Sequence, residues 1–151
     1  SVKAAIHEAK YRGSERAFAL LAEALREYLM DAELDAARTH LVPVPLASGR
    51  RKERGFNQAE EVVRRAAKEL GIIVESDLLV RTRETASQVS LPRKAREENM
   101  RGAFGAARPA NSSLTYIVFD DVITTGATLQ AAVDALKEAG AEHIIPLALA
   151  H

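Results

Sequence analysis

The stretch Val118-Phe119-Asp120-Asp121-Val122-Ile123-Thr124-Thr125-Gly126-Ala127-Thr128-Leu129 decides the fold of this chain. The apolar run 116–119 has the character of a buried strand, and from Leu129 onward apolar residues recur at helical spacing. The segment from Thr124 to Thr128 therefore lies where a strand passes into a helix. A strand followed by a helix in this way is typical of a parallel sheet covered by helices.

Chemically distinctive residues lie at this junction. Asp120 and Asp121 follow the apolar run, and small residues form the turn after them. A helix start presents unpaired backbone N–H groups and the positive end of its dipole, and Gly126 lets the backbone approach a bound anion. Carboxylates accept hydrogen bonds from sugar hydroxyls. The pattern favours a site for a phosphorylated sugar, with these phosphate-binding candidates: Thr124, Thr125, Gly126, Ala127 and Thr128.

Other interpretations of the junction are weaker. The chain contains neither a Gly-x-x-x-x-Gly-Lys-Ser/Thr loop nor a Gly-x-Gly-x-x-Gly dinucleotide motif. An ordinary strand-turn-helix connection with a capping threonine is the alternative, but it requires neither the acidic pair nor the run of small residues.

The remainder of the chain alternates between helical and strand patterns. Helices are expected at 14–30, 57–70 and 126–139, and strands at 41–44, from 78–80, at 116–119 and at 144–149. This order predicts an α/β fold with a mainly parallel sheet flanked by helices, in a single domain spanning residues 1–151. In such sheets ligands bind at the carboxyl ends of the strands, where the acidic pair falls.

Composition narrows the function classes. The chain of 151 residues has the size of one domain, and 21 basic residues balance 21 acidic ones, so bulk attraction to nucleic acid is not indicated. Cysteine is absent, which excludes disulfides and thiolate metal sites within this chain and makes a reducing cytoplasm the expected location. No apolar stretch approaches the ~20 residues that span a bilayer.

A second informative block follows the first expected strand. Arg50, Arg51, Lys52 and Arg54 are bracketed by two glycines, a pattern that suits binding of a diphosphate by guanidinium groups and closely approaching backbone. A solvated run of charge, a nucleic-acid patch, or a local pair between Arg54 and a nearby acid are the alternatives.

Both blocks resemble known families. The stretch around Asp120 resembles the phosphoribosyl-diphosphate (PRPP) signature of type I phosphoribosyltransferases. Pro43-Val44-Pro45-Leu46 and Arg54-Gly55-Phe56-Asn57-Gln58 resemble the hallmark of the ComF/GntX-type phosphoribosyltransferase-like proteins. Further matches to that family occur in order along the chain: Lys10-Tyr11-Arg12-Gly13, Arg83, Thr85, Gln88, Leu91, Arg96, Asn99 and Phe104.

The resemblance implies roles for named residues. Residues 124–128 would bind the 5-phosphate of PRPP, while Asp120 and Asp121 would bind the ribose hydroxyls or metal-bound water. Arg50, Arg51 and Arg54 would face the diphosphate. Magnesium would bridge diphosphate and ribose oxygens. The family commonly carries a cysteine-rich zinc segment, which this cysteine-free sequence lacks, so no zinc is assigned here.

The segment 82–108 is polar and poorly periodic, and this part of the chain has few apolar anchors and many hydrogen-bond donors: Arg81, Arg83, Gln88, Arg93, Lys94, Arg96 and Arg101. By resemblance, Arg83 and Gln88 would belong to a flexible loop or hood that covers the ligand. The alternative is a solvated loop followed by a short helix at 93–100.

Two functions stay open on the sequence. The first is a phosphoribosyltransferase that transfers the phosphoribosyl group from PRPP to a nitrogen acceptor. The second is a non-catalytic PRPP-binding module that acts in DNA uptake during natural competence, through contacts with DNA or DNA-processing proteins. A homo-oligomer is compatible with both.

Overall fold

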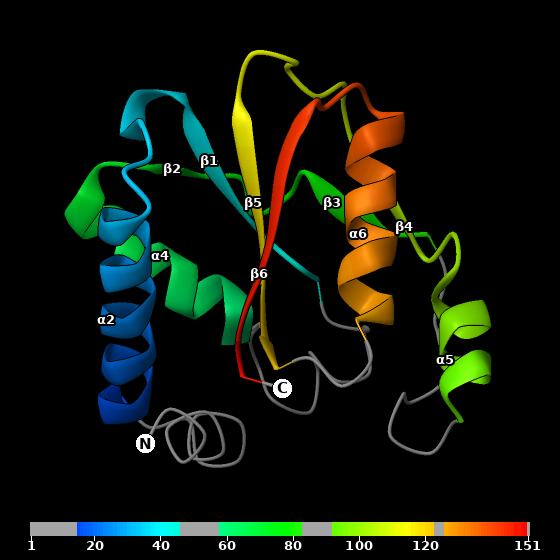
Figure 1. The fold of residues 1–151 in the computed structure, drawn as a ribbon, viewed down its shortest axis with the longest axis horizontal. Helices are drawn as coiled ribbons and strands as arrows, with labels where there is room; N and C mark the ends of the chain where they lie inside the picture. The colour runs from blue at the N-terminus through cyan, green and yellow to red at the C-terminus, as the bar shows by residue number, and fades with distance from the viewer. Residues whose placement is uncertain (1–14, 46–57, 83–91, 123–125, 151) are drawn as a thin grey trace.

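The computed structural model describes residues 15–45, 58–82, 92–122 and 126–150, and its centre is a four-stranded parallel sheet (Figure 1). The strand order is β2 (Ile73–Val74), β1 (Thr39–Pro43), β5 (Thr115–Val122) and β6 (His143–Ala150). The mainly parallel sheet flanked by helices that the sequence predicts is confirmed.

Helices cover both faces of the sheet (Figure 1). One face carries α2 (Glu15–Asp31) and α4 (Gln58–Leu70), which pack on Ile117 and Phe119 of β5. The other face carries α6 (Ala127–Glu138), which packs on Tyr116 and Val118. Alternate residues of β5 thus enter two separate cores, as the two-residue period of a strand requires.

A small two-stranded antiparallel sheet packs in the second core. It pairs β3 (Leu79–Arg81) with β4 (Phe104–Ala106), and α5 (Arg93–Met100) precedes β4 in the chain. Leu79, Phe104 and Met100 are buried in the same cluster as the inner face of α6. The β3–β4 sheet therefore packs on the same face of the parallel sheet as α6.

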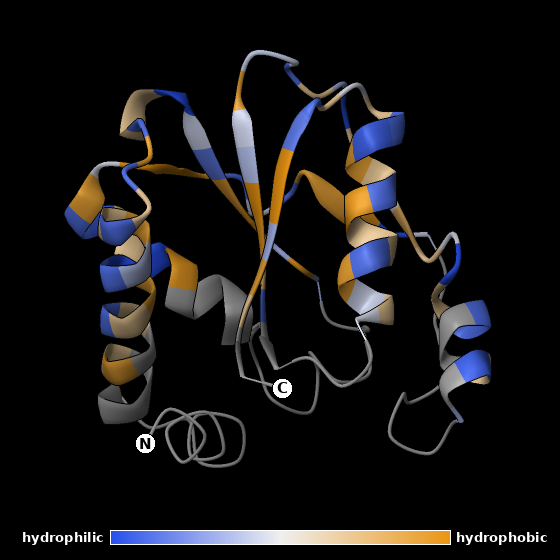
Figure 2. Ribbon diagram, in the orientation of Figure 1, coloured by the Kyte–Doolittle hydropathy of each residue, from blue (hydrophilic) through white to orange (hydrophobic). Residues whose placement is uncertain are grey.

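The amphipathic pattern of α6 explains its position. Figure 2 shows hydrophobic and hydrophilic bands alternating along this helix. Its apolar side chains recur at helical spacing and face the sheet: Ala127, Leu129, Ala132, Val133, Ala135 and Leu136 are buried. The helix ends before Gly140, whose φ of 108° suits a residue without a Cβ.

The observed elements differ from the predicted ones in the short elements and at the end of β5, which continues three residues beyond the predicted strand 116–119 and includes the acidic pair. β1 begins at Thr39, two residues before the predicted start, and a 3-10 turn, Ala36–Arg38, precedes it. β2 has 2 residues and β4 has 3, too few to produce a recognisable period. The segment 82–108 is the candidate for a loop or hood, with a short helix at 93–100 as the alternative. In its described part, α5 occupies the residues of that short helix, and β4 follows it.

Ion pairs connect the segments around the end of the edge strand β2. Glu75, after β2, accepts hydrogen bonds from His40 of β1 at 2.8 Å and from Arg108 at 2.5 Å, and Arg108 also reaches Asp77 at 3.3 Å. The hydrogen bond with Glu75 is the main reason that the pKa of Arg108 is raised above its ordinary value. These contacts join the segment that precedes β3 to the segment that follows β4.

Among the helices that the structure describes, none is both long and apolar enough to cross a membrane.

Candidate functional site

The central strand β5 brings an acidic side chain to the carboxyl edge of the sheet. Residues from Tyr116 to Phe119 are buried, and Asp120 follows them half-buried. Since side chains alternate along a strand, Asp120 lies on the same face as Val118, which packs against α6. Asp121 continues the backbone of β5, but its side chain lies outside the described residues.

Gly126 determines how the chain enters α6. It is the N-cap of the helix, with φ 83° and ψ −2°, and no side chain caps the helix there. This left-handed conformation is readily adopted by glycine and disfavoured for residues with a Cβ. The carbonyl of Gly126 accepts the first helical hydrogen bond, from the N–H of Gln130 at 2.8 Å.

The first residues of α6 complete the described part of the site. Ala127 is buried in the core under the helix, and Thr128 is half-buried. Because the first turn of a helix has N–H groups without intrahelical acceptors, this end of α6 can donate to an anion. A left-handed glycine, a helix start and a carboxylate at the adjoining strand end thus share one face of the carboxyl edge.

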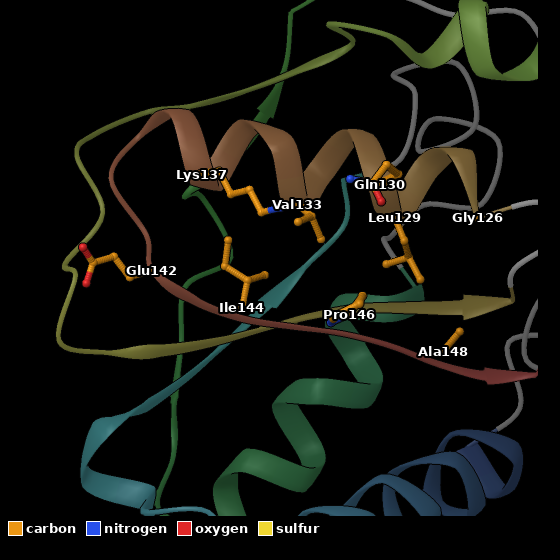
Figure 3. A pocket seen from close by; sticks show the side chains of 9 residues that line it. All are labelled: Gly126, Leu129, Gln130, Val133, Lys137, Glu142, Ile144, Pro146 and Ala148. Atoms are coloured by element: carbon orange, nitrogen blue, oxygen red, sulfur yellow. The ribbon is translucent and has the colours of Figure 1, made fainter.

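A pocket of about 590 Å³ lies between α6 and the edge strand β6. Figure 3 shows Gly126 at one end of it and Glu142 at the other, with apolar side chains of α6 and β6 between them. The lining residues are Gly126, Leu129, Gln130, Val133, Lys137, Glu142, Ile144, Pro146 and Ala148. The hollow therefore begins at the predicted phosphate-binding turn and follows the sheet edge away from it.

Apart from Asp121, of which only the backbone is described, the predicted site residues divide into two groups. Asp120, Gly126, Ala127 and Thr128 are placed, and the structure brings them to the same edge and face of the sheet. The others lie outside the described residues: Arg50, Arg51, Arg54, Arg83, Gln88, Thr124 and Thr125. Among the described residues, no group of three or more His, Asp and Glu side chains has the arrangement of a metal site.

The comparison with protein families covers nearly the whole chain. Residues 14–151 match the model of the phosphoribosyl transferase domain. The chain belongs to this family. The resemblance around Asp120 that the sequence shows is thereby confirmed.

Curated relatives of this phosphoribosyl transferase domain confirm the resemblance to ComF-type proteins. The DNA utilization protein YhgH of Salmonella typhimurium is 35% identical over 139 residues, covering 90% of this chain and 61% of that protein. Competence protein F of Haemophilus influenzae is 34% identical over 129 residues, covering 80% of this chain and 56% of that protein. The chain thus spans about three-fifths of the length of these relatives.

Solved structures support the fold. The allosteric regulatory enzyme of purine biosynthesis aligns with a TM-score of 0.55 at 21% identity, over 87% of this chain and 26% of the other. A hypoxanthine phosphoribosyltransferase from Staphylococcus aureus aligns with a TM-score of 0.55 at 10% identity, over 87% of this chain and 61% of the other. At these identities the likeness concerns the fold alone.

Proposed function

We propose that this domain binds PRPP or ribose 5-phosphate at the carboxyl edge of its sheet, with magnesium, and transfers the phosphoribosyl group to a nitrogen acceptor. The observation that carries the proposal is the left-handed Gly126 at the start of α6, four residues after the end of the strand that bears Asp120. Family membership supports the same assignment.

Each end of the ligand has a proposed partner. The N–H groups at the start of α6, with Gly126, Ala127 and Thr128, would hold the 5-phosphate, aided by Thr124 and Thr125. The carboxylates of Asp120 and Asp121 would accept hydrogen bonds from the ribose hydroxyls. The basic residues Arg50, Arg51 and Arg54 would bind the diphosphate, and Arg83 and Gln88 would close over it.

Magnesium fits the donor chemistry of this edge. Mg²⁺ prefers oxygen ligands, keeps several waters, and is usually held by one or two carboxylates together with substrate phosphates. Asp120 supplies such a carboxylate at the end of β5. When bound, the ion would neutralise charge on the diphosphate. The half-buried position of Asp120 favours contact with ligand hydroxyls or with water of the ion's hydration shell.

A second candidate function comes from the names of the relatives. The proteins called DNA utilization protein and Competence protein F suggest a module that binds PRPP without turnover and acts in DNA uptake through DNA or protein partners. In that case the basic run at 50–54 would contact a nucleic-acid backbone.

Diphosphate release distinguishes the two functions. The chain is mixed with PRPP, magnesium and a panel of nitrogen bases, and released diphosphate is measured. The enzyme proposal predicts release that depends on one class of base and is lost in Asp120→Asn. PRPP binding without release for any base would favour the non-catalytic module.

A further inference from the structure

One side chain of the two-stranded β3–β4 sheet reaches the carboxyl edge of the four-stranded parallel sheet. Arg81, the last residue of β3, donates its Nε–H to the backbone carbonyl of Pro45 at 3.2 Å. Its guanidinium carbon lies 5.0 Å from the centre of the Phe104 ring, which belongs to the residue paired with it on β4. A ring face on one side and a carbonyl acceptor on the other fix the position of the guanidinium group.

Pro45 lies next to the acidic end of β5. The N–H of Val44 donates to the carbonyl of Phe119 at 3.0 Å, and Pro45 and Asp120 are the next residues along the two neighbouring segments. Val44 and Phe104 share the core cluster on the α6 face. Arg81 therefore contacts this edge on the face of the sheet that α6 covers.

The position of Arg81 relates to one end of the proposed ligand. β1 and β6 flank β5 on opposite sides, and the pocket that contains Gly126 lies between α6 and β6. Arg81 and Pro45 are on the β1 side of Asp120 instead. With the 5-phosphate proposed at the start of α6 and the ribose at Asp120, a ligand that continues in the same direction across β5 would place its diphosphate at the end of β1.

We propose that Arg81 is a positioning residue for the diphosphate end of the ligand, acting through the Pro45 carbonyl and held by Phe104. This inference rests on the proposed function. Arginine suits the task because its planar group can stack on a ring and donate along its edge at once, which a lysine ammonium cannot do. The contact also connects β3 to the end of β1, at the edge where the ligand is proposed to bind.

Calorimetry with three ligands tests the assignment on the full chain. PRPP with magnesium, inorganic diphosphate and ribose 5-phosphate are each titrated into the wild type, Arg81→Lys and Arg81→Met. The matched control is Arg38→Met, which removes an exposed arginine just before β1. Both Arg81 variants are expected to bind PRPP and diphosphate about tenfold more weakly and ribose 5-phosphate within about twofold of wild type, with Arg38→Met unchanged.

Three results would overturn the inference. Unchanged PRPP affinity in both Arg81 variants would show that the contact has no effect on the ligand. A parallel loss of ribose 5-phosphate would show general damage to the edge. A wild type that binds neither PRPP nor ribose 5-phosphate would refute the proposed function itself, and that result appears before any variant is compared. Arg81→Lys keeps the charge and serves if Arg81→Met fails to fold.

Discussion

Two regions of the parallel sheet are built from different chemistry. Beside the edge strand β2, charged side chains pair with one another: His40 and Arg108 both bind Glu75, and Arg108 also reaches Asp77. At the carboxyl end of the central strand β5, the defining features are the conformation of Gly126, the start of α6 and the carboxylate of Asp120. The first arrangement joins segments of the protein, and the second suits an anionic ligand. Substitutions in the two regions should therefore separate stability from binding.

Gly126→Val should have the largest effect on binding. The valine must adopt the φ of 83° that glycine takes here, and its side chain would occupy the space next to the helix start. We expect loss of ribose 5-phosphate binding by more than about a hundredfold, measured by calorimetry, with the fold retained by circular dichroism.

The control is Gly71→Val, because Gly71 has a φ of 69° and open space where a Cβ would lie, but is located between α4 and β2. It should lose stability through backbone strain and keep ligand affinity. Normal sugar-phosphate binding by a folded Gly126→Val protein would remove the phosphate-binding role from this turn.

Replacing both aspartates, Asp120→Asn with Asp121→Asn, should have the next largest effect. Each charge-assisted hydrogen bond to a ligand hydroxyl or bound water is worth ~1.5–3 kcal/mol, so the magnesium-dependent affinity for PRPP should fall about tenfold to a hundredfold. Asp134→Asn is the control, since Asp134 is exposed on α6 and accepts a hydrogen bond from Gln130. Equal affinity in the double variant and the wild type would contradict the assignment of the acidic pair.

The basic run gives the third prediction. Replacing Arg50, Arg51 and Lys52 with alanine should weaken diphosphate binding about tenfold and leave ribose 5-phosphate binding nearly unchanged if the run serves the leaving group. If it contacts DNA, single-stranded DNA binding should weaken instead, and its salt dependence should flatten by roughly 0.7 of a log unit per lost contact. A variant unchanged toward both ligands would identify the run as a solvated surface.

Glu75→Ala should have the smallest effect on binding and a clear effect on stability. Its carboxylate is mostly buried, with 15% of the side chain exposed, and it bridges His40 and Arg108. Removing it should lower the free energy of unfolding by ~1–3 kcal/mol in chemical denaturation, because the mostly buried His40 loses its hydrogen-bond acceptor.

Asp77→Asn provides the comparison in the same region, since 85% of the Asp77 side chain is exposed and its loss should cost much less. A fall in PRPP affinity in Glu75→Ala without a fall in stability would contradict the division between the two regions.

The elements that the sequence predicts best are those with long, regular patterns. The spacing of apolar residues in α6 leads to the helix within one residue of its observed bounds, and the apolar run 116–119 leads to the strand β5, which continues to Val122. β2 and β4 are too short for any pattern, and β4 includes a glycine. They form because the tertiary fold places each beside a partner strand: β2 pairs with β1, and β4 pairs with β3.

The site is predictable only where it is local. Asp120 and Gly126 lie six positions apart in one strand-turn-helix unit, so their types and order already indicate the chemistry. The contact of Arg81 with Pro45 joins residues 36 positions apart, and that of His40 with Glu75 joins residues 35 apart. No sequence pattern predicts such pairs, because the packing of β3 and the pairing of the parallel strands bring the residues together only on folding.

The most direct test of the central claim is a calorimetric titration of this chain with PRPP, with and without magnesium. We expect binding at one site per chain that strengthens when magnesium is present and is lost in Gly126→Val but kept in Gly71→Val. The absence of binding to PRPP and to ribose 5-phosphate by the folded wild-type chain, or equal affinity in the two glycine variants, would contradict the claim.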